Sequence, residues 1–256
     1  DKPSISSEMG IFRELKKSNK NDEILKKESP VTLVDHLTEV REQLKVSLSR
    51  LKGLSETEKK AIEMASILHD IGKAHPIFQK ALGLNGWAGK DVWAKSGKQS
   101  VALKFERKGF RHELASLIIL LANQNLIREA IRDEVVFDLT SYLVVSHHGR
   151  IRCSVRSTPF EALNSQGSMI RGVMEGDEIP SLDLSNLLGV NLPPTRVDFS
   201  CLEAKEDSRS WVDRVWGLVE GPGSIGPFRL GYLEAIVRIS DWRASDMVPI
   251  VALGAY

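Results

Sequence analysis

Five of the six histidines in this sequence lie where a predicted helix begins or ends. None of the six falls in the polar amino-terminal stretch or in the proline-rich stretch that follows residue 157. Scattered surface histidines would not be expected to keep to helix ends, so the pattern indicates that several helix ends serve a common purpose. The histidines are His36, His69, His75, His112, His147 and His148.

One of these helix ends has the sequence Ile67-Leu68-His69-Asp70-Ile71-Gly72-Lys73. An apolar helical run ends in His69 and Asp70, and Gly72 then breaks the helix. Imidazole and carboxylate groups are common ligands of divalent metals, so the adjacent pair predicts a metal site. Taken alone, the heptapeptide fits a helix-capping histidine followed by a turn equally well, and the remaining histidines are needed to decide.

Apolar residues recur at spacings of three and four along much of the chain, as in Val34, Leu37, Val40 and Leu44, which predicts helices. Ser55, with a glutamate three residues later, predicts a capping box. We found no β-hairpin signals and no internal repeat, so the predicted class is all-α. The predicted helices cover about 34–51, 56–70, 77–84, 111–124, 129–133, 137–146, 211–219 and 230–243.

Polar segments divide the chain into an arm and a domain. We expect residues 1–30 to form a flexible amino-terminal arm and residues 31–256 to form one domain. Within that domain, residues 157–210 contain most of the prolines and predict an irregular insertion with little helix. Residues 85–110 predict a long functional or mobile loop.

Composition limits the classes of function. The chain has 256 residues, 42% of them hydrophobic and 27% charged, which is typical of a folded, water-soluble protein. Its formal net charge of +1 means that a polyanion would have to bind a local patch. The two cysteines, Cys153 and Cys201, are far apart and predict a reducing, cytoplasmic location. No apolar run reaches the length of a membrane span, so no membrane partner is expected.

Five short motifs occur in order along the chain: Asp35-His36, His69-Asp70-Ile71-Gly72-Lys73, Arg111-His112-Glu113-Leu114-Ala115-Ser116, Ser146-His147-His148-Gly149 and Ile239-Ser240-Asp241-Trp242-Arg243-Ala244-Ser245. Their order resembles the HD superfamily of metal-dependent phosphohydrolases. More narrowly, it is similar to the HD nuclease of the CRISPR type I nuclease–helicase. The segments 111–116, 171–177 and 226–230 look most like subtype I-U, also called I-G.

The resemblance implies an HD-superfamily helical bundle with two metal ions. It assigns His36, His69, Asp70 and Asp241 to one ion. The second ion shares Asp70 and uses His112, His147 and His148. Lys73 would lie near the metals and the phosphate, whereas His75 falls outside the ligand pattern and is expected to be structural or to lie outside the ligand shell.

Phosphodiester hydrolysis explains why such residues are needed. Two cations about 3.5–4 Å apart can neutralise the phosphate oxygens and activate a water, and a carboxylate such as Asp70 can bridge them. Imidazole ligands favour Mn, Fe, Co or Ni, so Mg is expected to support activity less well. Lys73 is expected to stabilise charge on the phosphate or on the leaving oxygen, the alternative being a solvated surface lysine.

Basic and aromatic residues outside the ligand set suggest nucleic-acid contacts. Arg150, Arg152 and Arg156 follow His148 and could hold a nucleic-acid backbone, although a solvated loop explains them equally well. Trp87 and Trp93 could stack on bases, although loop tryptophans more often pin the loop to the core.

The expected function is a metal-dependent nuclease that cuts single-stranded DNA in CRISPR interference and antiviral defence. The resemblance implies a helicase domain or subunit and the guide-RNA surveillance complex as partners. The sequence has no phosphate-loop motif and starts at Asp1, so we expect an HD domain excised from a larger nuclease–helicase, with a free-standing subunit as the other option. The alternative functions are an HD-type nucleotide or cyclic-dinucleotide phosphohydrolase, and a metal-stabilised scaffold without activity.

Overall fold

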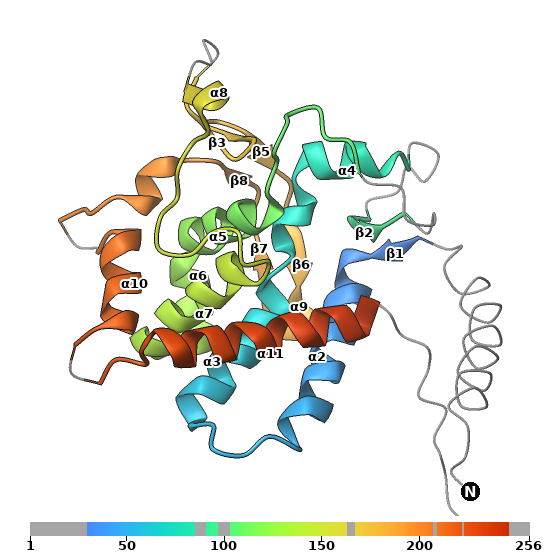
Figure 1. Ribbon diagram of the computed structural model, residues 1–256. Coiled ribbons are helices and arrows are strands. Elements are labelled where there is room, and N and C mark those ends of the chain that lie inside the picture. The colour runs from blue at the N-terminus through green and yellow to red at the C-terminus, as the bar shows by residue number, and fades with distance from the viewer. Residues whose placement is uncertain are drawn as a thin grey trace, which may run out of the picture.

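The structure is a computed structural model that describes residues 30–84, 91–96, 103–162, 167–206, 209–221 and 223–245. The arm predicted for residues 1–30 lies outside the described residues except for Pro30, and Trp87 also lies outside them. Figure 1 shows the described residues as a bundle of helices with short strands placed around it.

Five longer helices build the bundle. Helix α3 packs against α7 and α2, and α5 packs against α7. The last of the five, α11, lies across α2 and α3 and crosses the front of the bundle in Figure 1. The predicted all-α class is therefore confirmed. These helices are α2 (Leu33–Leu48), α3 (Glu56–Leu68), α5 (His112–Ala122), α7 (Glu134–Ser146) and α11 (Pro227–Ser245).

Shorter helices connect the longer ones. They are η1 (Ile71–Ala74), α4 (Pro76–Leu82), α6 (Gln124–Ile131), α8 (Pro159–Ala162), α9 (Ser185–Leu188), η2 (Phe199–Leu202) and α10 (Trp211–Val219). Within the described ranges, no single helix is long and apolar enough to cross a membrane, and α5 and α6 reach that length and composition only as a pair bent by 81°.

Local sequence signals explain where the helices begin. The predicted capping box at α3 is confirmed, since Ser55 Oγ accepts from the amide of Glu58 at 3.2 Å and Glu58 Oε2 accepts from the amide of Ser55 at 2.7 Å. Such a box satisfies two backbone donors that the first helical turn leaves free. Ser210 and Asp213 form a second capping box at the start of α10. The predicted boundaries of α10 are confirmed.

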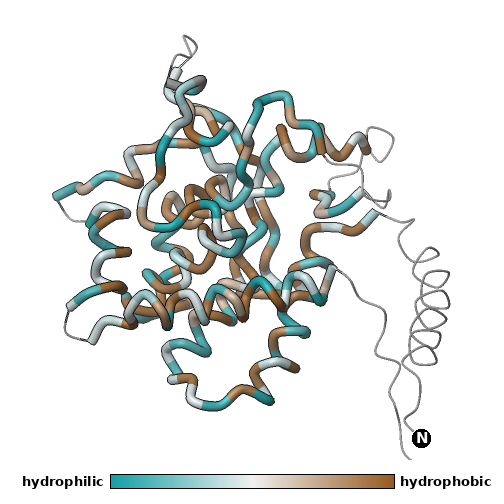
Figure 2. Tube along the Cα trace, in the orientation of Figure 1, coloured by the Kyte–Doolittle hydropathy of each residue, from teal (hydrophilic) through white to brown (hydrophobic). Residues whose placement is uncertain are grey.

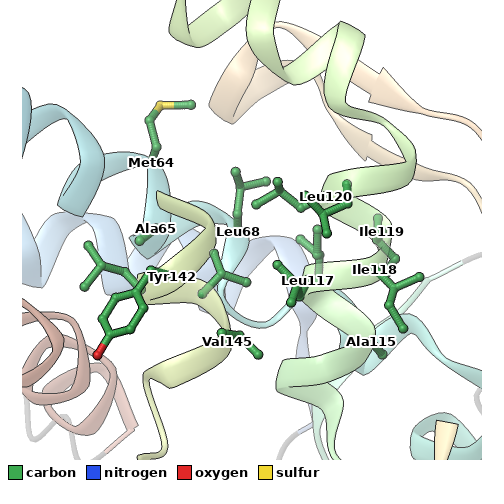
Figure 3. Close-up of a cluster of buried hydrophobic side chains, with 14 of the residues drawn as sticks. Met64, Ala65, Leu68, Ala115, Leu117, Ile118, Ile119, Leu120, Tyr142 and Val145 are labelled. Atoms are coloured by element: carbon green, nitrogen blue, oxygen red, sulfur yellow. The ribbon is translucent and has the colours of Figure 1, made fainter. Parts of the chain in front are cut away.

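The core lies between α3, α5 and α7. Figure 3 shows Met64, Ala65 and Leu68 of α3 in the same cluster as Ala115 and Leu117–Leu120 of α5. Helix α5 is buried on almost every side, which matches the hydrophobic residues along the central helices in Figure 2. Burying each large apolar side chain stabilises the fold by about 1.5–3 kcal/mol. This core fixes the ends of α3, α5 and α7 relative to one another.

Short antiparallel strands are present, which the sequence did not indicate. Three pairs lie within residues 157–210, where no hairpin was predicted, so that detail of the prediction was wrong. Each strand has only two or three residues, too few for an alternating pattern to stand out. The pairs are β1 (Val31–Thr32) with β2 (Trp93–Lys95), β3 (Met169–Ile170) with β4 (Val173–Met174), β5 (Glu178–Ile179) with β8 (Thr195–Arg196), and β6 (Leu182–Leu184) with β7 (Val190–Leu192).

The hairpin of β3 and β4 supports the start of α5. Its two-residue turn, Arg171-Gly172, has positive φ angles of 50° and 73°, as the favoured hairpin turns require. The carbonyl of Arg171 accepts a hydrogen bond from the amide of Arg111 at 2.9 Å. At the other end of α5, Asn123 donates to Thr195 Oγ1 at 2.9 Å. The stretch 157–210 therefore braces both ends of the helix that begins with His112.

Candidate metal centre

Seven side chains from five separate parts of the chain converge at one place. His36 lies in the first turns of α2, His69 and Asp70 follow α3, and His112 is the first residue of α5. The remaining three residues are His147 and His148, which follow α7, and Asp241, which lies on α11. The structure therefore brings together every side chain that the resemblance assigned to metal binding, in two groups whose ligand atoms lie within 4.8 Å of one another.

The first group contains two histidines and two carboxylates. His36 Nε2 lies 3.0 Å from Asp70 Oδ2 and 3.2 Å from Asp241 Oδ1. His69 Nε2 lies 3.3 Å from Asp70 Oδ2 and 3.8 Å from Asp241 Oδ1. All four residues are buried. Two imidazoles and two carboxylates are a donor set that divalent transition metals accept.

The second group contains three histidines around the other oxygen of the same aspartate. His112 Nε2 lies 3.0 Å from Asp70 Oδ1, and His147 Nε2 lies 3.8 Å from the same atom. His148 Nε2 lies 3.1 Å from His112 Nε2. Asp70 therefore gives Oδ2 to the first group and Oδ1 to the second, which is the arrangement of a bridging carboxylate.

Backbone carbonyls fix the orientation of two of the imidazoles. His69 Nδ1 lies 3.0 Å from the carbonyl oxygen of Ser66, and His147 Nδ1 lies 2.7 Å from that of Val144. Because a carbonyl only accepts hydrogen bonds, each Nδ1 carries the proton and each Nε2 faces the centre. A hydrogen bond from the second ring nitrogen commonly orients metal-binding histidines in this way.

Carboxylates govern the charge of the centre. Burial opposes a positive charge on His69, but Asp70 and Asp241 together raise the pKa of His69 to about 10. Burial and the neighbouring histidines hold the pKa of His147 well below 6.5, and burial together with His112 lowers the pKa of His148 to about 4. The first group therefore favours a positive charge on His69, whereas His147 and His148 of the second group favour the neutral form, in which imidazole binds metals.

The buried atoms at the centre fit a metal ion. His69 Nε2, Asp70 Oδ1 and His147 Nε2 are all buried and have no well-directed hydrogen-bond partner among the described residues. Leaving buried polar atoms unpaired costs about 1–3 kcal/mol each, so such a set calls for an explanation. Divalent ions coordinated by these atoms would supply it, and each of the two groups could hold one.

Lys73 lies at the edge of the centre. Its Nζ lies 2.5 Å from Asp70 Oδ2, and its side chain is only 12% exposed. The alternative of a solvated surface lysine does not fit this position. Glu113, which the sequence did not single out for a role, is fully buried with Oε2 3.8 Å from His112 Nδ1. That distance is too long for a hydrogen bond, so Glu113 lies behind His112 without holding its ring.

The three predicted DNA-contacting arginines do not behave alike. Arg152 donates from Nε and Nη2 to Glu234 of α11, both at 3.0 Å. Glu234 also pairs with Arg238, whose Nε donates to the carbonyl of His147 at 2.7 Å. Arg152 therefore belongs to a network that holds the double-histidine turn. Arg150 and Arg156 are exposed and form no ion pair with the described residues, so they remain predicted DNA contacts.

His75 joins the turn that contains His69 and Asp70 (residues 69–73, called the HD turn) to the stretch 157–210. Its Nδ1 accepts from the amide of Ile77 at 3.2 Å, and its Nε2 lies 3.0 Å from Asp177 Oδ2. Asp177 also accepts from Arg107 Nη2 at 2.8 Å. His75 is thus a structural residue next to the centre, outside both groups. Trp93 is partly buried and packs against the core, which fits the prediction that this tryptophan pins its loop to the core.

Comparison with known proteins agrees with this geometry. Residues 26–247 match the family described as "Cas3, HD domain". The chain is also 28% identical over 134 residues to a protein from Pyrococcus furiosus named "CRISPR-associated endonuclease Cas3-HD". That match covers 50% of this chain and 47% of the relative, so the chain spans about half the length of the curated relative it matches. Since the family match covers most of the sequence and all seven converging residues, the chain belongs to the family of Cas3 HD domains.

Proposed function

We propose that this chain is a metal-dependent nuclease that hydrolyses phosphodiester bonds of single-stranded DNA. The observation that carries the proposal is the Asp70 carboxylate, whose two oxygens face two separate groups of histidines. Membership of the Cas3 HD family and the name of the Pyrococcus furiosus relative, an endonuclease, support it. Two divalent cations held by these groups would neutralise the phosphate oxygens and activate a water for in-line attack.

The chain's own residues would position the reaction. Asp70 would keep the two groups in register, and the Nδ1 hydrogen bonds of His69 and His147 would hold their Nε2 atoms toward the centre. Lys73 would move from Asp70 to the phosphate and stabilise the charge that develops on its oxygens. The ligand set is rich in imidazole, so we expect Mn, Fe, Co or Ni to support activity better than Mg.

Both groups have a partly exposed side chain. In the second group the side chain of His112 is 14% exposed, and His148 is also partly exposed. In the first group the side chain of Asp241 is 11% exposed, so substrate would have access to both groups. Arg150 follows His148 and is exposed, which supports the proposal that it contacts the backbone of an approaching strand.

Incubation with circular single-stranded DNA and Mn²⁺ or Ni²⁺ tests the proposal. A nuclease that nicks internally converts the circle into linear fragments, and Asp70→Ala should abolish the reaction. Hydrolysis of free nucleotides or cyclic dinucleotides with the circle left intact would instead support the alternative HD phosphohydrolase. Elemental analysis of the loaded protein should find two ions per chain, and a value of one or none would contradict the dinuclear centre.

The biological setting follows from the same family. We propose that the chain acts in type I CRISPR interference, of subtype I-U or I-G, with a helicase domain or subunit and the guide-RNA surveillance complex as partners. We also propose that the chain works in the reducing cytoplasm, as expected from the small number and wide spacing of its cysteines, Cys153 and Cys201. Cleavage that depends on an added helicase and a guide-RNA complex bound to matching DNA would test this setting.

A further inference from the structure

A second lysine lies beside the centre on the side of α11. Lys95 ends strand β2, which pairs with β1 directly before the helix that carries His36. Its Nζ donates to Ser245 Oγ at 3.1 Å, and that hydroxyl lies 3.5 Å from Asp241 Oδ1. Lys95 therefore reaches the first group by way of Asp241, whereas Lys73 reaches it by way of Asp70. The sequence showed Lys95 only as one of several lysines in a long loop.

One glutamine holds the two lysine-bearing segments together. Gln79 of α4 donates from Nε2 to the carbonyl of Lys73 at 2.6 Å and to that of Trp93 at 2.8 Å. Its Oε1 accepts from the amide of Trp93 at 3.0 Å. With both amide atoms engaged, Gln79 sets the distance between the HD turn and strand β2. These hydrogen bonds therefore fix the backbone positions of Lys73 and of the strand that carries Lys95.

Lys95 is a partly buried lysine without a carboxylate partner among the described residues, unlike several other lysines. Lys45, Lys59 and Lys80 each form an ion pair with a glutamate. Lys95 is half-buried and forms no ion pair with any described carboxylate, although it donates to the Ser245 hydroxyl. Burial and the nearby charge of Lys73 lower the pKa of Lys95, against the attraction of Asp241. A bound anion would offset both the cost of burying the Lys95 charge and its repulsion by Lys73.

We propose that Lys95 binds the backbone phosphate next to the one that is cleaved. This inference rests on the proposed nuclease function and names a further substrate-binding residue for it. Lys73 touches the bridging carboxylate and is suited to the scissile phosphate, while Lys95 lies farther out, beyond Ser245. A substrate with a single phosphodiester would therefore use Lys73 alone, and a DNA strand would use both lysines.

Two substrates separate these roles. The variant Lys95→Ala should hydrolyse bis(p-nitrophenyl) phosphate, which has one phosphodiester, at the rate of the unaltered protein. On a single-stranded oligonucleotide it should show KM raised by about 5- to 10-fold with kcat nearly unchanged, and the slope of log affinity against log salt should fall by about 0.7. Lys95→Arg should restore most of the affinity. Lys95→Gln provides a second neutral variant that keeps a hydrogen-bond donor, in case the alanine variant folds poorly.

Lys45→Ala is the matched control. Lys45 is an exposed lysine nine residues beyond His36 on α2, about 14 Å along the helix, and its removal changes the net charge equally. Equal loss of activity on both substrates in Lys95→Ala would show that Lys95 supports the metal centre, and it would overturn the proposal. Unchanged KM and salt dependence on DNA would overturn it as well. Failure of the unaltered protein to cut DNA would instead overturn the nuclease function together with this inference.

Discussion

The amide of Gly72 donates to Ser116 Oγ at 2.8 Å, in a contact between the HD turn and α5 that leaves no room for a side chain. The same hydroxyl donates to the carbonyl of His69 at 2.7 Å. Ser116 therefore ties the HD pair to the helix that begins with His112. This contact sets the distance between Asp70 and His112, on which the second ligand group depends.

Substitution of Gly72 by alanine should therefore damage both stability and metal binding. The added methyl group would lie 2.5 Å from the amide nitrogen of Ser116 and closer still to the carbonyl oxygen of His112. Because both are backbone atoms, α5 would have to move away, and we expect a loss of about 2–4 kcal/mol in the free energy of unfolding. Urea denaturation and metal titration measure the two effects.

Gly231→Ala is the control for that experiment. Gly231 lies in α11 with open space around it and without a positive φ. The change should leave metal binding intact and stabilise the helix by about 0.5–1 kcal/mol. Similar behaviour of the two glycine variants would contradict the role given to the contact between the HD turn and α5.

Removal of the Asp70 carboxylate should cost more metal binding than any other single substitution in the centre. Among the described residues, Asp70 is the one that belongs to both ligand groups, so we expect Asp70→Ala to bind neither ion at micromolar concentrations and activity to fall by at least about 10³-fold. Circular dichroism should show unchanged helix content. Glu129→Ala removes an exposed carboxylate on α6 and should bind metal normally. Retention of two ions by Asp70→Ala would rule out the bridging role.

Metal loading should stabilise the fold, because the ligands come from five parts of the chain. A ligand that binds only the folded state adds about 2.7 kcal/mol at a concentration one hundred times its Kd. Differential scanning fluorimetry should therefore show a rise in Tm with Mn²⁺ or Ni²⁺ after chelator treatment, and a smaller rise with Mg²⁺. The Asp70→Ala protein serves as the blank, and a shift of equal size in that variant would place the stabilising ion elsewhere.

Arg152 and Arg150 should have different effects on stability. Arg152→Ala removes the bidentate partner of Glu234, which is buried, and should destabilise the protein by about 1–2 kcal/mol while loosening the His147-His148 turn. Arg150→Ala should change stability by less than about 0.5 kcal/mol and weaken DNA binding only. Denaturation curves and DNA-binding titrations of the two variants distinguish support of the turn from contact with substrate.

Asp177 should make stability depend on acid pH. Burial opposes its charge, but His75 and Arg107 hold the pKa of Asp177 well below 3.8. Above pH 3.8 the carboxylate is ionised in both folded and unfolded protein, so its full contribution is present. As the pH falls below 3.8, the unfolded chain takes up the proton first, and the contribution is lost. The difference in unfolding free energy between the unaltered protein and Asp177→Asn should therefore shrink steadily as the pH falls below about 4. A constant difference would argue against the ion pair.

The family resemblance identified in advance the seven residues that the structure brings together, because the motifs that carry it restrict both residue type and position. His69-Asp70 and His147-His148 stand at the ends of strongly periodic helices, and the ends of helices packed in one core meet in space. The capping signal at Ser55 is local in the same way, since both partners lie within four residues. Such features depend little on the rest of the fold.

Other features depend on partners far away in the sequence. Arg152 looked like its neighbours Arg150 and Arg156, and only the folded chain shows that Glu234 lies beside it. Lys95 gave no distinguishing signal because its place depends on strand pairing with Val31 and on the side chain of Gln79. The strands after residue 157 are likewise held by tertiary contacts rather than by their own β propensity.

The position of Asp241 on α11 has a consequence for the protein while it is being made. The first of the seven converging residues, His36, and the last, Asp241, are separated by 205 residues, and α11 is the final helix in the described part of the chain. During translation the first group stays without its second carboxylate until α11 has emerged from the ribosome and folded onto α2 and α3. An unfinished chain therefore lacks a complete first group until synthesis has passed residue 241.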